Sequence, residues 1–184
     1  MGHAPLLITA HELHVYDEPG KHVELVRGRL LVHEPPGFVH GDVVQRIGFA
    51  IGLFLHPNSP RVGRVVVGDT GFWVQRDPDT VRAPDIAYVR EEQIPAAPVY
   101  GFAEFPPDLA VEVRSPNDRT GALLGKVADW ISAGAALVWV VDPARRTAQV
   151  YRPDGSITLL GVPQALDGEG VLPGFTLPLA SLFD

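Results

Sequence analysis

The chain has no cysteine among its 184 residues, so it has no disulfide framework, no thiolate metal site and no cysteine nucleophile. Basic residues are also scarce, because 15 Lys and Arg stand against 22 Asp and Glu, and the formal net charge is -7. An acidic average surface repels nucleic acids and membrane surfaces, so a polyanionic partner would need a local basic patch. These absences exclude thiol chemistry and make a nucleic-acid partner less expected.

Long hydrophobic runs are missing as well. The longest apolar stretch, IGFAIGLFL at residues 47–55, is about half as long as a membrane span. The first ten residues have no basic segment and only a short apolar stretch, unlike a signal peptide. We therefore expect a cytoplasmic protein that neither enters a membrane nor is exported.

The remaining composition is that of a folded domain. Hydrophobic residues make up 46% of the chain and charged residues 20%, which suits a chain long enough to bury one core. No internal repeat or low-complexity linker divides the sequence. We expect a single domain over residues 1–184.

The order of predicted elements indicates an α/β fold. The pattern predicts a short helix capped by Thr9 and ending near Glu18, a hairpin of strands 22–26 and 29–33, and a core helix over 40–55 closed by residues 56–58. Strands follow at 63–69, 71–77 and 83–90, then a proline-rich loop at 94–107. The end of the chain predicts strands at 147–152 and 156–160 and an irregular apolar tail at 171–183.

Between these parts lies a predicted βαβ unit. The segment LAVEV at 109–113 predicts a buried strand, and GALLGKVADWISAG at 121–134 predicts a helix with an Asn-Asp start and a glycine stop. The almost wholly apolar LVWVV at 137–141 is typical of a central parallel strand covered on both faces. We expect the two strands to lie side by side with the helix across them.

An acid inside the first of these strands requires an explanation. Side chains alternate along a strand, so Asp108, Glu112 and Arg114 share one face. A carboxylate in a half-buried sheet must be paired, hydrogen-bonded or bound to a cation. Lys126 lies beside the apolar stripe of the following helix, and Asp85 starts the strand 83–90. Both could approach Glu112.

Several blocks carry a family resemblance along nearly the whole chain. They are HVELVRGRLLV, RAPDIAYV, PDLAVEVRSPNDR, Lys126, AALVWVVDP and VLPGFTLPLASLF, in this order. In these blocks the chain resembles the Uma-two family of restriction endonucleases, within the PD-(D/E)xK nuclease superfamily. The resemblance implies a restriction-endonuclease-like fold, in which helices flank a mixed central β-sheet and additional β-hairpins are attached.

The resemblance also implies a metal site. Asp85 stands at the family's motif aspartate and Glu112 at its second acid, and both would hold Mg²⁺ or Mn²⁺, since Mg²⁺ prefers oxygen ligands. The ion would activate a water and neutralise charge on a DNA phosphate. The usual lysine position holds Arg114, a possible auxiliary residue that could stabilise anionic charge but cannot act as a base. Lys126 matches the family's helix lysine and is the candidate for that role.

Two auxiliary residues match more loosely, and each assignment has an alternative. Glu24 could add a carboxylate to the site, and His40 could contact phosphate or move a proton. Alternatively, the acids form structural ion pairs, Lys126 extends to water and His40 makes an ordinary hydrogen bond at a helix start. Local salt bridges or solvation at the strand end are the favoured interpretations for Arg114 and Asp108.

Two functional hypotheses follow from these residues. The first is a Mg²⁺-dependent nuclease that hydrolyses DNA phosphodiester bonds through Asp85, Glu112 and Lys126. The alternative is a catalytically inactive nuclease-fold module that binds nucleic acid or protein, which the acidic net charge and Arg114 leave open. The apolar tail and the strand edges make a homodimer plausible in either case.

Overall fold

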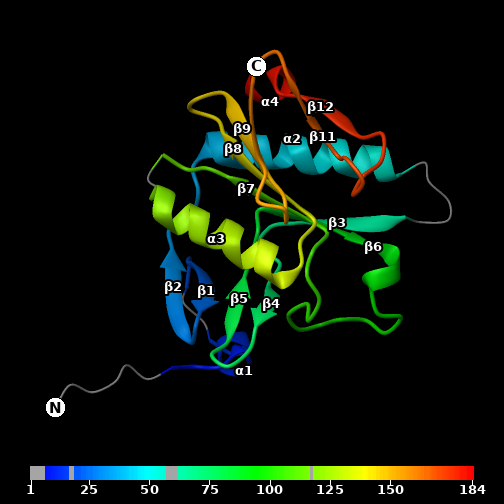
Figure 1. Ribbon diagram of the computed structural model, residues 1–184. Coiled ribbons are helices and arrows are strands. Elements are labelled where there is room, and N and C mark those ends of the chain that lie inside the picture. Colours follow the sequence, from blue (N-terminus) through cyan, green and yellow to red (C-terminus); the bar gives the residue numbers. More distant parts are fainter. Residues whose placement is uncertain (1–6, 17–18, 57–61, 117) are drawn as a thin grey trace.

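The computed structural model describes residues 7–16, 19–56, 62–116 and 118–184. Its helices are α1 (Ala10–His14), α2 (Phe38–Leu55), the 3-10 turn η1 (Glu91–Gln93), α3 (Thr120–Ala133) and α4 (Ala180–Phe183) (Figure 1). Its strands are β1 (His22–Val26), β2 (Arg29–His33), β3 (Gly63–Val67), β4 (Phe72–Gln75), β5 (Thr80–Arg82), β6 (Ile86–Arg90), β7 (Leu109–Val113), β8 (Leu137–Asp142), β9 (Thr147–Tyr151), β10 (Ile157–Gly161), β11 (Ala165–Asp167) and β12 (Thr176–Pro178).

A six-stranded mixed sheet forms the centre, in the order β10-β9-β8-β7-β6-β3. Strands β7 and β8 are parallel, and β6, β9, β3 and β10 pair antiparallel with their neighbours. The parallel pair confirms the predicted βαβ unit, because α3 connects β7 to β8. A second sheet has the order β2-β1-β5-β4, and β11 pairs with β12.

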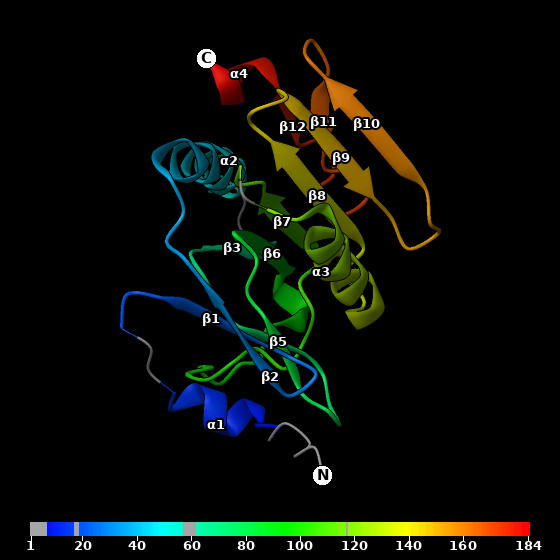
Figure 2. The ribbon, with the colours of Figure 1, turned by 90° about the vertical axis from the view of Figure 1, so that its left-hand side faces the viewer.

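Helices α2 and α3 cover opposite faces of the central sheet (Figures 1 and 2). Alternation along β7 explains the two layers. Leu109, Val111 and Val113 pack with α2, whereas Ala110 packs with α3. Glu112 is two residues after Ala110, so its side chain lies on the same face of β7 and points towards α3. Because every residue of β7 is buried, its acid lies inside the protein rather than on a half-exposed surface.

Helix α3 begins and ends for different reasons. Gly134 adopts a left-handed φ of 112° at its C-terminus, a conformation that glycine reaches without penalty, as the sequence predicted. The predicted Asn-Asp start is wrong in its position. Arg119 is the residue before the helix, and it makes no side-chain hydrogen bond to the helix end. Asn117 lies outside the described residues.

Most predicted elements are present, and the errors fall on short segments. The hairpin has the predicted bounds, and α1 has the predicted cap at Thr9, although α1 ends at His14. The sequence missed β5, whose three residues are too few to show a period. The predicted irregular tail is wrong, because it includes β12 and α4. The predicted end of the first helix near Glu18 is wrong, because α1 ends at His14. The core helix α2 ends at Leu55 as predicted but begins at Phe38 rather than at His40. Glu18 and residues 57–58 lie outside the described residues.

Helix α2 is long and apolar. Among the described residues, it is the one helix whose length and composition would allow it to span a membrane. Its Val43, Ile47 and Ile51 are packed in the core against the central sheet. The buried residues of α2 are confined to this one side of the helix, and 22% of the 18-residue helix is buried.

Candidate active site

Asp85 and Glu112 are brought together by the pairing of β6 with β7. Ile86 is opposite Val111 in this antiparallel pair, so continuing the register by one residue places Asp85 opposite Glu112. The Asp85 carboxylate accepts a hydrogen bond from the Val113 backbone N–H at 2.6 Å. The two candidate metal ligands therefore lie side by side where β6 begins and β7 ends.

The Glu112 carboxylate is held by two donors from α3. Lys126 Nζ donates to Glu112 Oε2 at 2.9 Å, and Trp130 Nε1 donates to Glu112 Oε1 at 2.8 Å. Lys126 and Trp130 are four residues apart and therefore neighbours on one helix face. With only 3% of Glu112 exposed, both carboxylate oxygens have a partner from the same helix.

Glu24 joins the site from the smaller sheet. Its Oε1 lies 3.3 Å from Lys126 Nζ and accepts from the Ala83 backbone N–H at 3.0 Å. Its Oε2 accepts from Arg82 at 3.0 Å and lies 3.1 Å from His33 Nε2. Lys126 thus bridges Glu24 and Glu112, and its ammonium also donates to the Ala83 carbonyl at 3.2 Å.

Burial and charge shift the pKa values of this cluster in opposite directions. Burial, with added repulsion from Asp85 and Glu24, raises the pKa of Glu112 against the opposing attraction of Lys126. Burial alone would lower the pKa of Lys126, but the charges of Glu112 and Glu24 raise it. At neutral pH Lys126 is therefore a cation that donates hydrogen bonds.

His40 contacts the carboxylate of Asp85. Its Nε2 is 3.1 Å from Asp85 Oδ1, and its Nδ1 is 3.3 Å from Ser115 Oγ. Burial alone would lower the pKa of His40, but the hydrogen bond and charge of Asp85 outweigh burial and raise it. The imidazole orients the Asp85 carboxylate and is fixed in turn by Ser115.

Arg114 and Asp108 point to other partners. Arg114 lies 3.5 Å from Asp142 and donates to Thr120 Oγ1 at 3.0 Å. Asp108, at the opposite end of β7, accepts from the Arg90 backbone N–H at 2.8 Å and from Gln93 at 2.6 Å. These contacts agree with the local pairing that the sequence favoured for both residues.

Sequence reasoning missed three residues of the site. Trp130 was assigned only to the apolar stripe, although its position four residues after Lys126 could have revealed it. Ser115 follows Glu112 by three residues and was assigned only to a turn. No local signal pointed to Arg82, because its buried contacts with Glu24 and Asp129 depend on how the smaller sheet packs against α3.

The donor chemistry fits a hard divalent cation. Asp85 and Glu112 offer carboxylate oxygens, and repulsion among Asp85, Glu112 and Glu24 is a strain that a cation would relieve. Within the described ranges, no three His, Cys, Asp or Glu side chains are grouped closely enough to hold an ion by themselves. Mg²⁺ often takes one or two protein carboxylates and completes its shell with water, so Asp85 and Glu112 could hold it.

The fold has a close match among solved structures. A crystal structure described as that of "a putative nuclease belonging to DUF820 from Anabaena variabilis ATCC 29413" matches with a TM-score of 0.84 at 20% identity. The match covers 96% of this chain and 97% of that chain. It confirms the predicted mixed α/β fold. No curated protein sequence matches the chain.

The sequence then defines the family within that fold class. Residues 9–180 match the Uma2 family, described as "Putative restriction endonuclease". The chain belongs to this family, which confirms the resemblance carried by the sequence blocks. Membership of this family supports a nuclease.

Acid titration of Glu24 gives a testable prediction about this cluster. Burial alone would raise its pKa, but the hydrogen bond from His33 and the charges of Lys126 and Arg82 lower it from 4.5 to about 2. A carboxyl group whose pKa is lowered by folding stabilises the folded state at every pH above its pKa in the unfolded chain. For Glu24 this contribution is lost as the pH falls from about 4.5 to about 2. Its size is about 3 kcal/mol.

We therefore expect Glu24→Gln to flatten the pH dependence of stability. Wild type should be more stable than the variant at pH 6, and the difference should shrink as pH falls towards 2. Urea unfolding at stepped pH measures both curves. Glu34→Gln, at an exposed ion pair with Lys21, is the matched control. Parallel curves for wild type and Glu24→Gln from pH 6 to pH 2 would contradict the prediction.

Proposed function

We propose that the protein is a Mg²⁺-dependent nuclease that hydrolyses DNA phosphodiester bonds at Asp85, Glu112 and Lys126. The observation that carries this proposal is the Lys126 ammonium, 2.9 Å from the Glu112 carboxylate, beside Asp85 in a member of a restriction endonuclease family. Acid and lysine side chains of this kind, meeting in a buried cluster, are what a metal-assisted phosphoryl transfer requires.

Each side chain has a separate role in the proposal. Asp85 and Glu112 would hold Mg²⁺ or Mn²⁺, and the bound ion would supply charge neutralisation at the phosphate and water activation. Lys126 stabilises negative charge that develops on the phosphate, because its raised pKa keeps it protonated. His40 orients Asp85, and Trp130 orients Glu112.

The direct test is a cleavage assay with Asp85→Asn. Wild type is expected to cut DNA in Mg²⁺ or Mn²⁺ and not in EDTA, and the variant should lose this activity together with metal binding measured by calorimetry. Linear, supercoiled and single-stranded DNA should be assayed separately, with RNA as a further substrate. Equal metal-dependent cleavage by wild type and Asp85→Asn would refute the proposed site.

One observation favours the second candidate function, an inactive module that binds nucleic acid or protein. The position that usually carries the motif lysine holds Arg114. Its side chain contacts Asp142 and Thr120 rather than the candidate metal ligands Asp85 and Glu112. If wild type binds metal and DNA without cutting any of the substrates, this alternative replaces the nuclease proposal.

The helix α2 and the edge strand β3 support a homodimer. The outward side of α2 carries four exposed apolar side chains, Phe38, Val39, Phe49 and Leu53. Strand β3 pairs with β6 at one edge of the central sheet, and the described residues place no strand on its other side. An apolar helix face beside an open strand edge suits a self-complementary contact with a second copy.

The homodimer is tested by light scattering after gel filtration. We expect a dimer for wild type and a monomer for the double variant Phe49→Glu and Leu53→Glu, with the same circular dichroism spectrum. A monomeric wild type at micromolar concentration would exclude the dimer.

The remaining expectations complete the proposal. We propose a single domain over residues 1–184, supported by a central sheet whose two faces carry the two largest cores. We also propose a cytoplasmic location, which suits a DNA substrate.

A further inference from the structure

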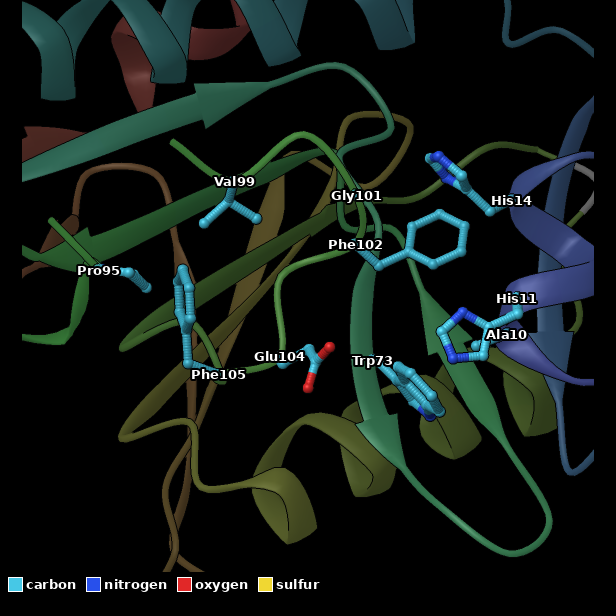
Figure 3. Close-up of a pocket in the computed structure, with 10 residues that line it drawn as sticks. All are labelled: Ala10, His11, His14, Trp73, Pro95, Val99, Gly101, Phe102, Glu104 and Phe105. Carbon is cyan, nitrogen blue, oxygen red and sulfur yellow. The ribbon is translucent and has the colours of Figure 1, made fainter. Parts of the chain in front are cut away.

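One pocket in the described part of the chain lies away from the acid cluster. It has a volume of about 340 Å³ and lies between α1, β4 and the loop after η1 (Figure 3). Aromatic and imidazole rings form much of its wall, and Glu104 projects between them. Its lining residues are Ala10, His11, His14, Trp73, Pro95, Val99, Gly101, Phe102, Glu104 and Phe105.

The pocket is built by fixed contacts rather than by a loose loop. The backbone N–H of Trp73 donates to the Ala103 carbonyl at 2.8 Å, and the backbone N–H of Ala103 donates to the Gly71 carbonyl at 2.9 Å. A Cβ on Gly71 would lie 2.4 Å from the Phe102 ring, so only glycine lets this ring seat there. His11 and His14 pack edge-on against Trp73 and Phe102.

A guanidinium group already contacts two of the lining residues, Trp73 and Glu104. The Arg76 side chain lies over the Trp73 ring, with its guanidinium carbon 3.9 Å from the ring centroid. The same group donates to Glu104 Oε2 at 2.5 Å. An aromatic face and a carboxylate are the two groups that recognise a flat cation, and the chain's own arginine shows that Trp73 and Glu104 are spaced to bind one.

We propose that this pocket binds an arginine side chain of a partner polypeptide. Glu104 is the one acid among the lining residues, which include no lysine or arginine, so the wall favours a cation over a phosphate or a carboxylate. This site is independent of the proposed DNA cleavage.

Arg76 acts as an internal competitor in this proposal. Both Arg76 and Glu104 are largely exposed, at 54% and 61% of their side chains, and an exposed ion pair contributes little to stability. An incoming arginine can therefore displace Arg76 from Glu104 at small cost. Removing Arg76 should strengthen binding of an external guanidinium.

The test is an NMR titration that follows the indole N–H of Trp73. The probes are a blocked Gly-Arg-Gly peptide, the same peptide with neutral citrulline in place of arginine, and agmatine as a free guanidinium. We expect a saturable shift with the arginine peptide and none with the citrulline peptide. Glu104→Gln should weaken arginine binding about fivefold or more, and Arg76→Ala should tighten it about fivefold.

The possible results separate this inference from its alternatives. Equal binding of arginine and citrulline peptides, or unchanged binding in Glu104→Gln, would overturn the proposal, as would no shift in both wild type and Arg76→Ala. Binding of agmatine without binding of the peptide would overturn the assignment to a polypeptide. Glu112→Gln should bind the arginine peptide as wild type does, because Glu112 lies outside this pocket.

Discussion

Replacing Glu112 by glutamine is expected to abolish metal-dependent DNA cleavage while leaving the protein folded. The amide keeps the shape of the carboxylate, and one of its atoms can still accept from Trp130. It removes the negative charge that would hold the cation beside Asp85. Because charge stabilisation in a buried site typically contributes a factor of 10² or more, we expect cleavage to fall by about 10²-fold or more.

The measurement is the initial rate of cleavage in Mg²⁺ and in Mn²⁺, with the thermal midpoint as a check on folding. Glu34→Gln makes the same chemical change at an exposed ion pair and should retain full activity. Cleavage by Glu112→Gln at the wild-type rate would remove Glu112 from the proposed site, even if the family assignment holds.

Replacing Arg82 by methionine is expected to cause the largest loss of stability. Only 6% of the Arg82 side chain is exposed, and it lies 3.0 Å from Glu24 and 2.7 Å from Asp129. Methionine fills much of the same volume but removes the cation that pairs with Asp129 and one of the cations that pair with Glu24, which keeps Lys126. Breaking a buried ion pair from one side typically costs about 3–5 kcal/mol, so we expect a loss of this size in the free energy of unfolding.

Urea unfolding at pH 7 measures the effect, and Arg64→Met is the matched control. Arg64 forms an exposed pair with Glu91, for which a loss of about 0–1 kcal/mol is typical. Similar losses for Arg82→Met and Arg64→Met would show that Arg82 is not a structural cation of the cluster.

The sequence predicted the part of the site that is close along the chain. Glu112 and Lys126 lie on a strand and on the helix that follows it, so the alternation of β7 and the periodicity of α3 were enough to bring them together. The approach of Asp85 was also predictable, because it starts an adjoining strand. Whether these residues bind metal stays a prediction.

The sequence could not predict how the smaller sheet packs on α3. Arg82 belongs to a three-residue strand, and its contacts with Glu24 and Asp129 span 58 and 47 residues. Such contacts depend on tertiary packing rather than on local propensity. The same reason applies to His40, whose contact with Ser115 joins residues 75 apart.

Glu24 comes from β1 of the smaller sheet, whereas Glu112 belongs to the central sheet, and Lys126 touches both. The candidate site therefore lies between two sheets, and the described strands of each sheet pair only within that sheet. A local opening that released the β1–β2 hairpin would withdraw one negative charge from Lys126 without moving Asp85 or Glu112. Hydrogen exchange of the β1 and β2 amides would measure how often the hairpin opens. It would thus show how often Glu24 leaves the site and only Asp85 and Glu112 remain.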